Sequence, residues 1–421
     1  MSTADLTQNA RENRKTKAGL FKRLENITVF GTKIFVSGGF DIIYFILVIA
    51  LLTTGLVMMA SASYVWGTFH NNDPYHYIVN QGVVAVVGVG AMFVISKINP
   101  QVFKKSAILI SIVGFLLLVL VLFYYEPIPD KPDIKRWMMI PIINKTFQPS
   151  DVGKVAMIIG LAWGLEKGKK LLDKNIWFPL VYFAVVAVVS LLVFAESHLS
   201  AFLMIFAMGV GILFLSGMDR RWFIFFGVIG VLAIAILFGL RDHILSEYQN
   251  ARIDSFFVKD YTDIDGRWQT NQSLYALGSG GLFGLGLGNS RQKYMYIPEP
   301  HNDFIFAIVG EELGFFRCVI IILLFLALVA RGFIIAERTK SMYERLLVLG
   351  VSLQVGIQFV LNILVVTDMI PNTGISLPFF SYGGTALLIL LAEMGLVLGV
   401  SRTGSRDAKV KKENKEENRN A

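Results

Sequence analysis

Long apolar runs alternate with shorter polar connections along the whole chain. A membrane-spanning helix needs about 20 apolar residues to cross roughly 30 Å of hydrocarbon, whereas strands of a membrane β-barrel are about ten residues of alternating polarity. The runs in this chain have helical length and do not alternate. The pattern therefore predicts ten spans, over residues 41–63, 79–97, 106–125, 151–166, 177–195, 199–217, 222–240, 303–331, 345–367 and 384–401.

Composition supports the same fold class. Hydrophobic residues make up 54% of the 421 residues and include 33 phenylalanines, more apolar side chain than a soluble chain buries. We therefore predict an all-α polytopic membrane protein with about ten transmembrane helices. The single cysteine, Cys318, lies inside a predicted span and excludes a disulfide framework. About 40 polar residues precede the first run, so we expect no removable signal peptide.

Basic residues set the predicted orientation, because loops rich in Lys and Arg face the cytoplasm. They gather in the tails and in the second, fourth, sixth and eighth connections: Lys97, Lys104 and Lys105; Lys167, Lys169, Lys170 and Lys174; Arg220 and Arg221; Arg338, Lys340 and Arg345. We therefore expect both termini in the cytoplasm, with an N-terminal tail over residues 1–40, a membrane domain over 41–402 and a disordered tail over 403–421. These positions account for most of the net charge of +8, so we expect no nucleic-acid partner.

The longer connections, residues 126–150, 241–302 and 368–383, then face outward, and the largest joins the seventh and eighth spans. A polytopic protein with short inner turns and a large extracellular loop carries its functional surface outside. This asymmetry disfavours chemistry driven by ATP.

Several outer polar residues run against the charge pattern. Arg136 precedes Trp137 in an outer loop, and Lys154 lies about one turn into the fourth span. A pyrophosphate or a sugar acid would give these cations a partner. Alternatively, Trp137 lies in an interfacial belt, Arg136 pairs with a nearby aspartate or a lipid phosphate, and Lys154 extends toward the membrane surface. Glu196 and His198 lie in a short turn between spans, where they either line a cavity or face solvent.

The segment NQSLYALGSGGLFGLGLGNSRQK, residues 271–293, is rich in glycine. A dinucleotide site needs a strand before the glycines and a helix after them, and the surrounding sequence shows neither. Glycines such as Gly280 and Gly281 let backbone amides approach an anion closely, which predicts a nest for phosphate oxygens. A tightly packed or flexible turn at the membrane surface is the alternative.

Carboxylates at the eighth span are the strongest signal. Asp303 lies at its outer end, where a carboxylate either caps the helix or performs chemistry. Glu311 and Glu312 lie deeper, and an unpaired carboxylate in a bilayer costs at least a few kcal/mol, so both must face protein, water or a cation. At about 100° per residue, Glu311 is about 80° round from Asp303 and Glu312 points nearer the opposite side.

The last outer connection, DMIPNTGISLPFFSYGG, contains Pro371 and Pro378. Proline and glycine at these positions exclude one continuous helix, which predicts a broken or re-entrant segment. A rigid turn is the alternative.

Four motifs follow one another across the ten spans: RW…FQPSDVGK, NQSLYALGSGGLFGLGLGNSRQK, YIPEPHNDFIFAIVGEELGF and PNTGISLPFFSYGGT. Together they resemble the SEDS family of peptidoglycan polymerases, most nearly its members that act in cell division. The resemblance implies a metal-assisted glycosyltransferase in the bacterial cytoplasmic membrane. Such an enzyme joins lipid II to a growing glycan strand at the outer face and releases undecaprenyl pyrophosphate.

The resemblance also implies roles for single residues. The aspartate of the family's His-x-Asp-Phe motif falls on Asp303, which would be the catalytic base. A divalent cation, Mg or Mn, is implied, with Asp303 as a candidate ligand, and no organic cofactor. Candidates for substrate binding are Arg136, Lys154, Gln272, Ser273, Gly280, Gly281, Glu299, His301 and Ser381. Candidates for a structural or cavity-lining role are Trp137, Glu196, His198, Glu311, Glu312, Pro371 and Pro378.

Some positions depart from the family pattern. Asp151 stands where the family often has glutamate, and the change from His-Thr-Asp to His-Asn-Asp keeps the carboxylate. The sequence ESHLSA replaces the usual Pro-Asp-Leu-Gly-Thr between the fifth and sixth spans. The role of that family aspartate is therefore not transferred to Glu196 or His198.

The implied partners are lipid II, undecaprenyl-linked glycan, a class B penicillin-binding protein and other division proteins, with the chain at the septum. Two other functions stay open. A transporter (flippase) of the lipid-linked precursor would suit intramembrane carboxylates such as Glu311, although the internal repeats typical of transporters are not evident. A non-catalytic division scaffold would not need a carboxylate and basic residues near an outer cavity.

Overall fold

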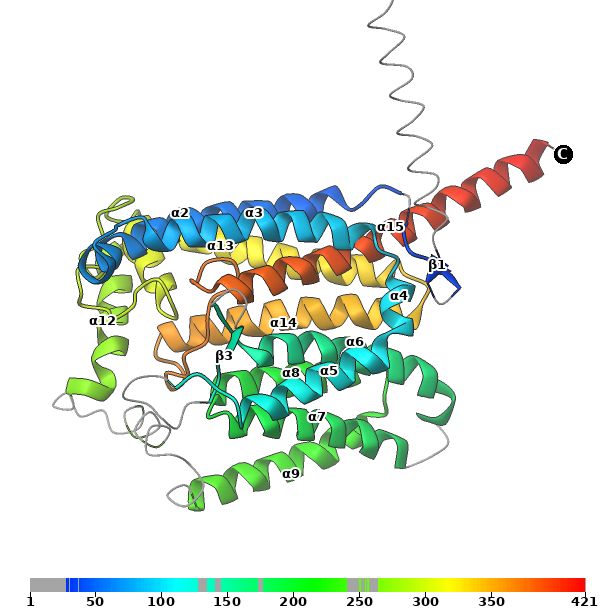
Figure 1. Ribbon diagram of the computed structural model, residues 1–421, viewed down its shortest axis with the longest axis horizontal. Coiled ribbons are helices and arrows are strands. Elements are labelled where there is room, and N and C mark those ends of the chain that lie inside the picture. Colours follow the sequence, from blue (N-terminus) through cyan, green and yellow to red (C-terminus); the bar gives the residue numbers. More distant parts are fainter. Residues whose placement is uncertain are drawn as a thin grey trace, which may run out of the picture.

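The computed structural model describes residues 28–29, 31–36, 38–127, 135–140, 145–172, 177–240, 250, 254, 256 and 264–420. Within these residues, ten long helices correspond to the ten predicted spans and run along the long axis of the molecule (Figure 1). They are α2 (Ile42–Asn71), α3 (His76–Lys97), α5 (Ala107–Val121), α6 (Pro149–Leu172), α7 (Trp177–Ala195), α8 (Leu199–Leu215), α9 (Arg220–Gly239), α13 (Ile305–Glu337), α14 (Met342–Val366) and α15 (Gly384–Asn420).

The remaining described elements lie at the two ends of this bundle. Helix α12 (Ile264–Gly280) falls within the predicted large loop and lies at one end, here called the α12 end (Figure 1). The short helix α4 (Pro100–Lys105) and the hairpin of β1 (Thr28–Val29) and β2 (Thr32–Lys33) lie at the opposite end. A second antiparallel hairpin pairs β3 (Met138–Ile140) with β4 (Lys145–Phe147), with Met139 opposite Thr146.

The helices have the length and surface of membrane spans. Six of them, α2, α3, α7, α13, α14 and α15, are long and apolar enough to cross a membrane, and α5 and α8 are apolar but shorter. Large apolar side chains such as Val86 on α3 and Ile224 on α9 are mostly exposed, as expected of surfaces that face lipid. The chain is therefore a multi-pass membrane protein.

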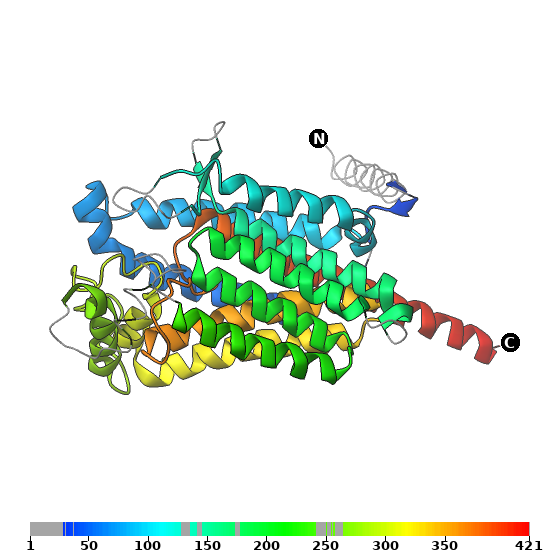
Figure 2. The same ribbon diagram turned by 90° about the horizontal axis from the view of Figure 1, so that it is seen from below.

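The bundle is built around α13 and α14, which pack against each other, with α2 on one side and α6 and α8 on the other. Phe325 of α13 stacks on Phe359 of α14 with ring centroids 4.3 Å apart. Helix α15 packs along α3, and α5 packs along α6. Helix α9 lies at the edge of the bundle (Figures 1 and 2) and contacts α7 through rings such as Phe226, which stacks on Phe183 at 3.9 Å.

Two helix boundaries differ from those expected from sequence. Helix α13 begins at Ile305, so Asp303 precedes the helix, and Gly314 interrupts it with φ 77° and ψ 177°. Residues 301–304 form turns instead, and the carbonyl groups of Asn302 and Asp303 accept hydrogen bonds from Ser381 and Asn362. Helix α15 continues to Asn420, whereas the sequence predicts disorder from residue 403. Lys and Glu have high intrinsic helix propensity, which favours this continuation.

Candidate active site

The turn that carries Asp303 is held in place through hydrogen bonds to its backbone carbonyl groups. The three consecutive carbonyl oxygens of residues 301–303 each accept a hydrogen bond from another part of the chain: from Tyr382 N at 2.9 Å, from Ser381 Oγ at 2.9 Å and from Asn362 Nδ2 at 2.8 Å. The donors come from α14 and from the segment before α15. Since three adjacent peptide groups are fixed, the half-buried side chain of Asp303 has a defined position at the α12 end.

The segment over residues 367–383 contains no helix, as the prolines predict, and it enters the bundle. Buried backbone without secondary structure needs side-chain partners, and here glutamines provide them. Gln358 Nε2 donates to Ser376 O at 2.9 Å. Gln81 of α3 donates to Ser381 O and accepts from Gly383 N, both at 3.2 Å. Residues 376–383 are thereby fixed between α3 and α14.

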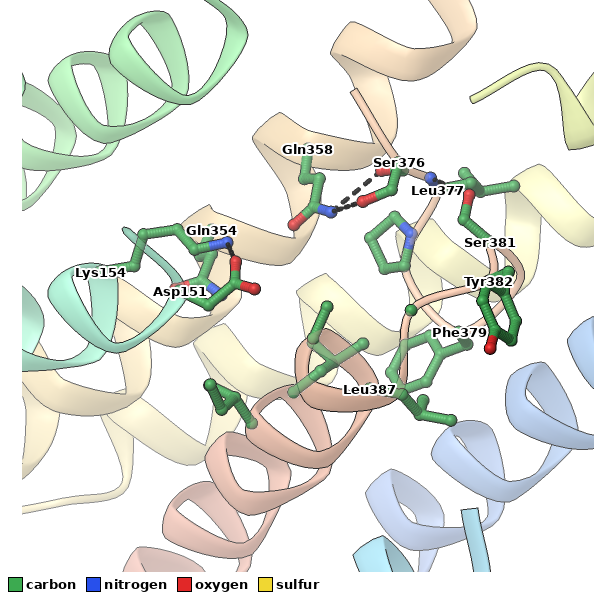
Figure 3. A pocket seen from close by; sticks show the side chains of 15 residues that line it. Asp151, Lys154, Gln354, Gln358, Ser376, Leu377, Phe379, Ser381, Tyr382 and Leu387 are labelled. Atoms are coloured by element: carbon green, nitrogen blue, oxygen red, sulfur yellow. Dashed lines mark hydrogen bonds and ion pairs between the residues drawn. The ribbon is translucent and has the colours of Figure 1, made fainter. Parts of the chain in front are cut away.

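A small cavity of about 40 Å³ separates this segment from α6 (Figure 3). Lys154 and Asp151 of α6 line one side and are themselves paired, with Nζ and Oδ1 2.7 Å apart. Ser381, Pro378 and other residues of the segment line the opposite side. Because Ser381 also binds the Asn302 carbonyl, one short segment joins the cavity to the turn that carries Asp303.

His301 is buried in a cage of aromatic rings. Its ring lies 4.4 Å from Tyr77, 5.7 Å from Tyr382 and 6.2 Å from Trp66. Burial lowers the pKa of His301 to about 4, and the neighbouring His70 adds to the effect. His301 is therefore neutral near pH 7, and it supports the turn by packing rather than by charge.

The turn between α7 and α8 contains a fully buried acid, Glu196. Burial raises the pKa of Glu196 to about 9, although the guanidinium of Arg136 opposes this shift, and the carboxylate of Asp151 reinforces it. Arg136 also donates to the Ser197 carbonyl. At neutral pH Glu196 is therefore protonated, and its side chain does not neutralise the positive charge of Arg136.

Three other predicted residues lie around this turn and the neighbouring loops. His198 Nδ1 and Gln148 Nε2 are 2.8 Å apart, which ties the turn to the start of α6. The carbonyl of Trp137 accepts from Glu126 N at 2.8 Å. Glu299 is exposed and accepts from Asn302 Nδ2 at 2.7 Å. The sequence left cavity lining and solvation open for His198, and the structure shows a half-buried side chain with a polar partner.

Glu311 is bound by the glycine-rich segment. Its carboxylate accepts from Arg291 N at 3.0 Å, from Gln292 N at 3.2 Å and from the hydroxyl groups of Ser290 and Ser279. The amides that could have formed a nest for phosphate thus bind a carboxylate of the protein.

Glu312 is bound by the same segment. Its Oε1 lies 3.0 Å from Lys293 Nζ, and Ser61 Oγ of α2 donates to the carboxylate at 2.7 Å. Both residues of the ion pair are buried. Backbone hydrogen bonds that pair residues 281–286 with 311–316 bring the two glutamates to one segment.

The glycines of α12 and the following turn allow close packing against α13. A Cβ on Gly280 would lie 2.1 Å from the Gly310 carbonyl oxygen, and a Cβ on Gly284 would lie 2.2 Å from the Glu312 carbonyl oxygen. Gly281 adopts φ +54°, and its carbonyl accepts from Phe315 N at 2.9 Å. The structure thus favours the packed-turn alternative for this segment.

Gln272 and Ser273 are buried within α12. Ser273 Oγ donates to the Val366 carbonyl at the end of α14, at 2.8 Å. Gln272, Ser273, Gly280 and Gly281 do not line the cavity beside Lys154. The predicted substrate-binding residues therefore form two groups. One group lies around the cavity and the turn of Asp303, and the other packs α12 against α13 and α14.

The described residues contain no group of three or more His, Cys, Asp or Glu that could hold a metal ion. Mg²⁺ is commonly bound through one or two carboxylates together with phosphates of the substrate. Asp303 fits that kind of site, since it is a single half-buried carboxylate on a turn whose backbone is fixed.

Sequence reasoning missed several buried polar residues of α14 and α15. Asn362 positions Asp303, and Gln354 Nε2 donates to Glu393 Oε2 of α15 at 2.7 Å. Gln354 also lines the cavity beside Lys154. Their signal was present, because each is a lone polar residue in an apolar run, but no sequence pattern identifies their partners.

Comparison with known proteins gives one family. A family described as cell cycle protein, with FtsW, RodA and SpoVE as its members, matches residues 42–406. The stage V sporulation protein E of Bacillus subtilis is 37% identical over 368 residues, covering 86% of this chain and 97% of the relative. The probable peptidoglycan glycosyltransferase FtsW of Geobacter sulfurreducens is 34% identical, covering 86% of this chain and 95% of the relative.

Solved structures show the same fold. A chain from a peptidoglycan synthase complex, described as coordinating polymerization and crosslinking, superposes with a TM-score of 0.69 at 25% identity, covering 87% of this chain and 98% of that chain. The rod shape determining protein RodA of Thermus thermophilus superposes with a TM-score of 0.60 at 25% identity, covering 86% and 97%.

Proposed function

This chain belongs to the FtsW/RodA/SpoVE family of cell cycle proteins, and from that membership we propose that it is a peptidoglycan glycosyltransferase that polymerises lipid II. Relatives named for this activity match nearly their whole length. One observation supports the catalytic assignment: the backbone of the turn at residues 301–303 is fixed by Asn362, Ser381 and Tyr382, and Ser381 of this set also lines the Lys154 cavity.

In the proposed reaction, the 4-hydroxyl oxygen of the acceptor sugar attacks the anomeric carbon of the donor. A β-1,4 glycosidic bond forms, the bond from the anomeric carbon to the pyrophosphate oxygen breaks, and the hydroxyl proton passes to the carboxylate of Asp303. A positioned base of this kind contributes roughly 10²- to 10⁴-fold to a rate. The leaving group is undecaprenyl pyrophosphate.

Cationic side chains near the cavity would stabilise the charge of that leaving group. Lys154 is buried and paired with Asp151 at 2.7 Å, so it is held in place before substrate binds. Arg136 lies beside Glu196, which is protonated at neutral pH and does not cancel the guanidinium charge. When bound, a divalent cation would supply further charge compensation, with Asp303 as its protein carboxylate.

We further propose that the α12 end faces outward, with both termini in the cytoplasm and the chain at the division septum. The distribution of basic residues supports the orientation. A class B penicillin-binding protein is the proposed partner. The similarity to a chain of a peptidoglycan synthase complex supports this proposal.

The test is a polymerisation assay with purified full-length chain, its penicillin-binding partner and lipid II. Wild-type protein should form long glycan strands, and Asp303→Asn, which keeps the size but accepts no proton, should form none while folding normally. Asp73→Asn, in the turn between α2 and α3, is the matched control and should stay active. Strand formation by Asp303→Asn would refute the catalytic assignment. Lipid II movement across liposomes that survives Asp303→Asn would instead favour a transporter.

A further inference from the structure

A second polar cavity lies at the end of the bundle opposite Asp303. It has a volume of about 160 Å³ and lies between the C-terminal part of α6, the end of α8 and the turn from α13 to α14. Three basic residues from these elements line it: Lys169, Lys340 and Arg345. Since a water molecule occupies about 30 Å³ of the liquid, the cavity has room for a phosphate group.

The electrostatics of this cavity favour an anion. None of the described residues that line it is acidic. Glu166 accepts from Ser341 Oγ of the lining, and its other carboxylate oxygen lies 2.5 Å from Lys104 Nζ. The charge of Glu166 is therefore compensated by Lys104. Three cations around one cavity raise the local positive potential, which attracts an anion.

The backbone adds to this preference. Helix α14 begins at the cavity, with Ser341 as its N-cap, and the N-terminus of a long helix carries partial positive charge. At the end of α8, the carbonyl groups of Ile212, Leu213 and Phe214 already accept hydrogen bonds, among them the bond from Ser216 Oγ to Leu213 O at 2.6 Å. The hydroxyl of Thr339 likewise donates to the Ile335 carbonyl at 2.9 Å. An anion would therefore be bound by the cationic side chains.

The remaining lining is apolar, from Leu215, Met342 and Leu346. A cavity with a cationic rim and an apolar base, at the ends of membrane-spanning helices, matches the phosphate and glycerol of a phospholipid. Basic pockets between transmembrane helices bind such headgroups, and each Lys or Arg near an anionic surface strengthens the attraction.

We propose that this cavity is a binding site for the phosphate-bearing headgroup of an anionic phospholipid. The site is independent of glycosyl transfer, because its residues lie at the opposite end from Asp303 (Figure 1). It gives the basic residues of this end a specific ligand in addition to their effect on topology.

The test uses purified full-length chain in neutral detergent, titrated with dioleoyl phosphatidylglycerol or dioleoyl phosphatidylcholine and measured by native mass spectrometry. Wild-type protein should bind one phosphatidylglycerol more tightly than phosphatidylcholine. The triple variant Lys169→Gln, Lys340→Gln, Arg345→Gln should lose about tenfold or more of that affinity. Each single variant should lose a smaller part, which keeps the site testable if the triple variant misfolds.

The matched control removes the same three charges elsewhere at this end, with Lys33→Gln, Lys97→Gln and Lys105→Gln, all of which are exposed residues. It should keep the wild-type affinity within about threefold. Equal losses in both triple variants, or equal affinity for the two lipids, would overturn the site. Displacement of the lipid by millimolar inorganic phosphate would overturn the lipid assignment in favour of a soluble phosphate ligand, whereas retention of the lipid supports it.

Discussion

The side-chain amide of Asn362 donates to the carbonyl oxygens of both Asp303, at 2.8 Å, and Ile375, at 2.7 Å. Asn362 is fully buried in α14. A single amide therefore joins three parts of the chain: the middle of the bundle, the turn before α13 and the irregular segment that lines the Lys154 cavity. Its two N–H groups are both used.

Asn362→Leu keeps the approximate size of the side chain and removes both donors. Two buried carbonyls would lose partners at a cost of about 1–3 kcal/mol each. The turn should then shift, and glycan polymerisation should fall at least tenfold with little change in lipid II binding. Asn80→Ala is the control, since that amide donates to His76 within its own helix at 2.9 Å. Wild-type polymerisation by Asn362→Leu would refute the positioning role.

Gly280 and Gly278 provide a matched pair within one helix. A Cβ on Gly280 would lie 2.1 Å from the Gly310 carbonyl oxygen, whereas a Cβ on Gly278 would meet nothing within 4 Å. Gly280→Ala should therefore displace α12 from α13 and lower the thermal unfolding midpoint by several degrees. Gly278→Ala should be neutral or slightly stabilising, because alanine favours helix by about 1 kcal/mol. The measurement is thermal unfolding in detergent, and equal midpoints for the two variants would contradict the close contact.

The spans were predictable because each must supply an unbroken apolar run, whatever its neighbours are. All ten predicted runs correspond to helices in the structure. The location of Asp303 at the outer end of the eighth span was also readable from the sequence, although the helix begins two residues later, at Ile305. The helical character of α12 was not, since its polar and glycine residues resemble a loop, and packing against α13 and α14 decides its structure.

Partners of buried polar groups were the least predictable part. Helical geometry gave the directions of Glu311 and Glu312 relative to Asp303, but it did not reveal that residues 290–293 bind both carboxylates. Likewise, the pairing of Gln354 with Glu393 joins positions on different helices that no local pattern relates. Such contacts depend on the tertiary arrangement of helices.

The buried pair of Lys293 and Glu312 makes a double-variant test. Lys293→Met leaves the Glu312 carboxylate without its cation and should destabilise the protein by about 3–5 kcal/mol. Adding Glu312→Gln removes the unpaired charge and should recover most of that loss, because Ser61 can still bind the amide. Thermal or denaturant unfolding of the four proteins measures the coupling. Additive losses in the double variant would show that the two charges do not interact.

His301 should make stability depend on pH in a defined window. Its pKa in the folded protein is about 4, mainly through burial, against 6.5 for an ordinary histidine. Between these values the unfolded chain binds the proton more readily, so stability should fall as pH decreases from about 6.5 to about 4, by up to about 3 kcal/mol. His301→Phe keeps an aromatic ring against Tyr77 and Tyr382 and should flatten this part of the profile. The measurement is the unfolding midpoint at a series of pH values.

His70→Phe, which replaces an exposed ring, is the control. It should retain most of the wild-type dependence of stability on pH, because burial rather than His70 is the main cause of the pKa shift of His301. Identical pH profiles for wild type and His301→Phe would show that this ring is not protonated on unfolding.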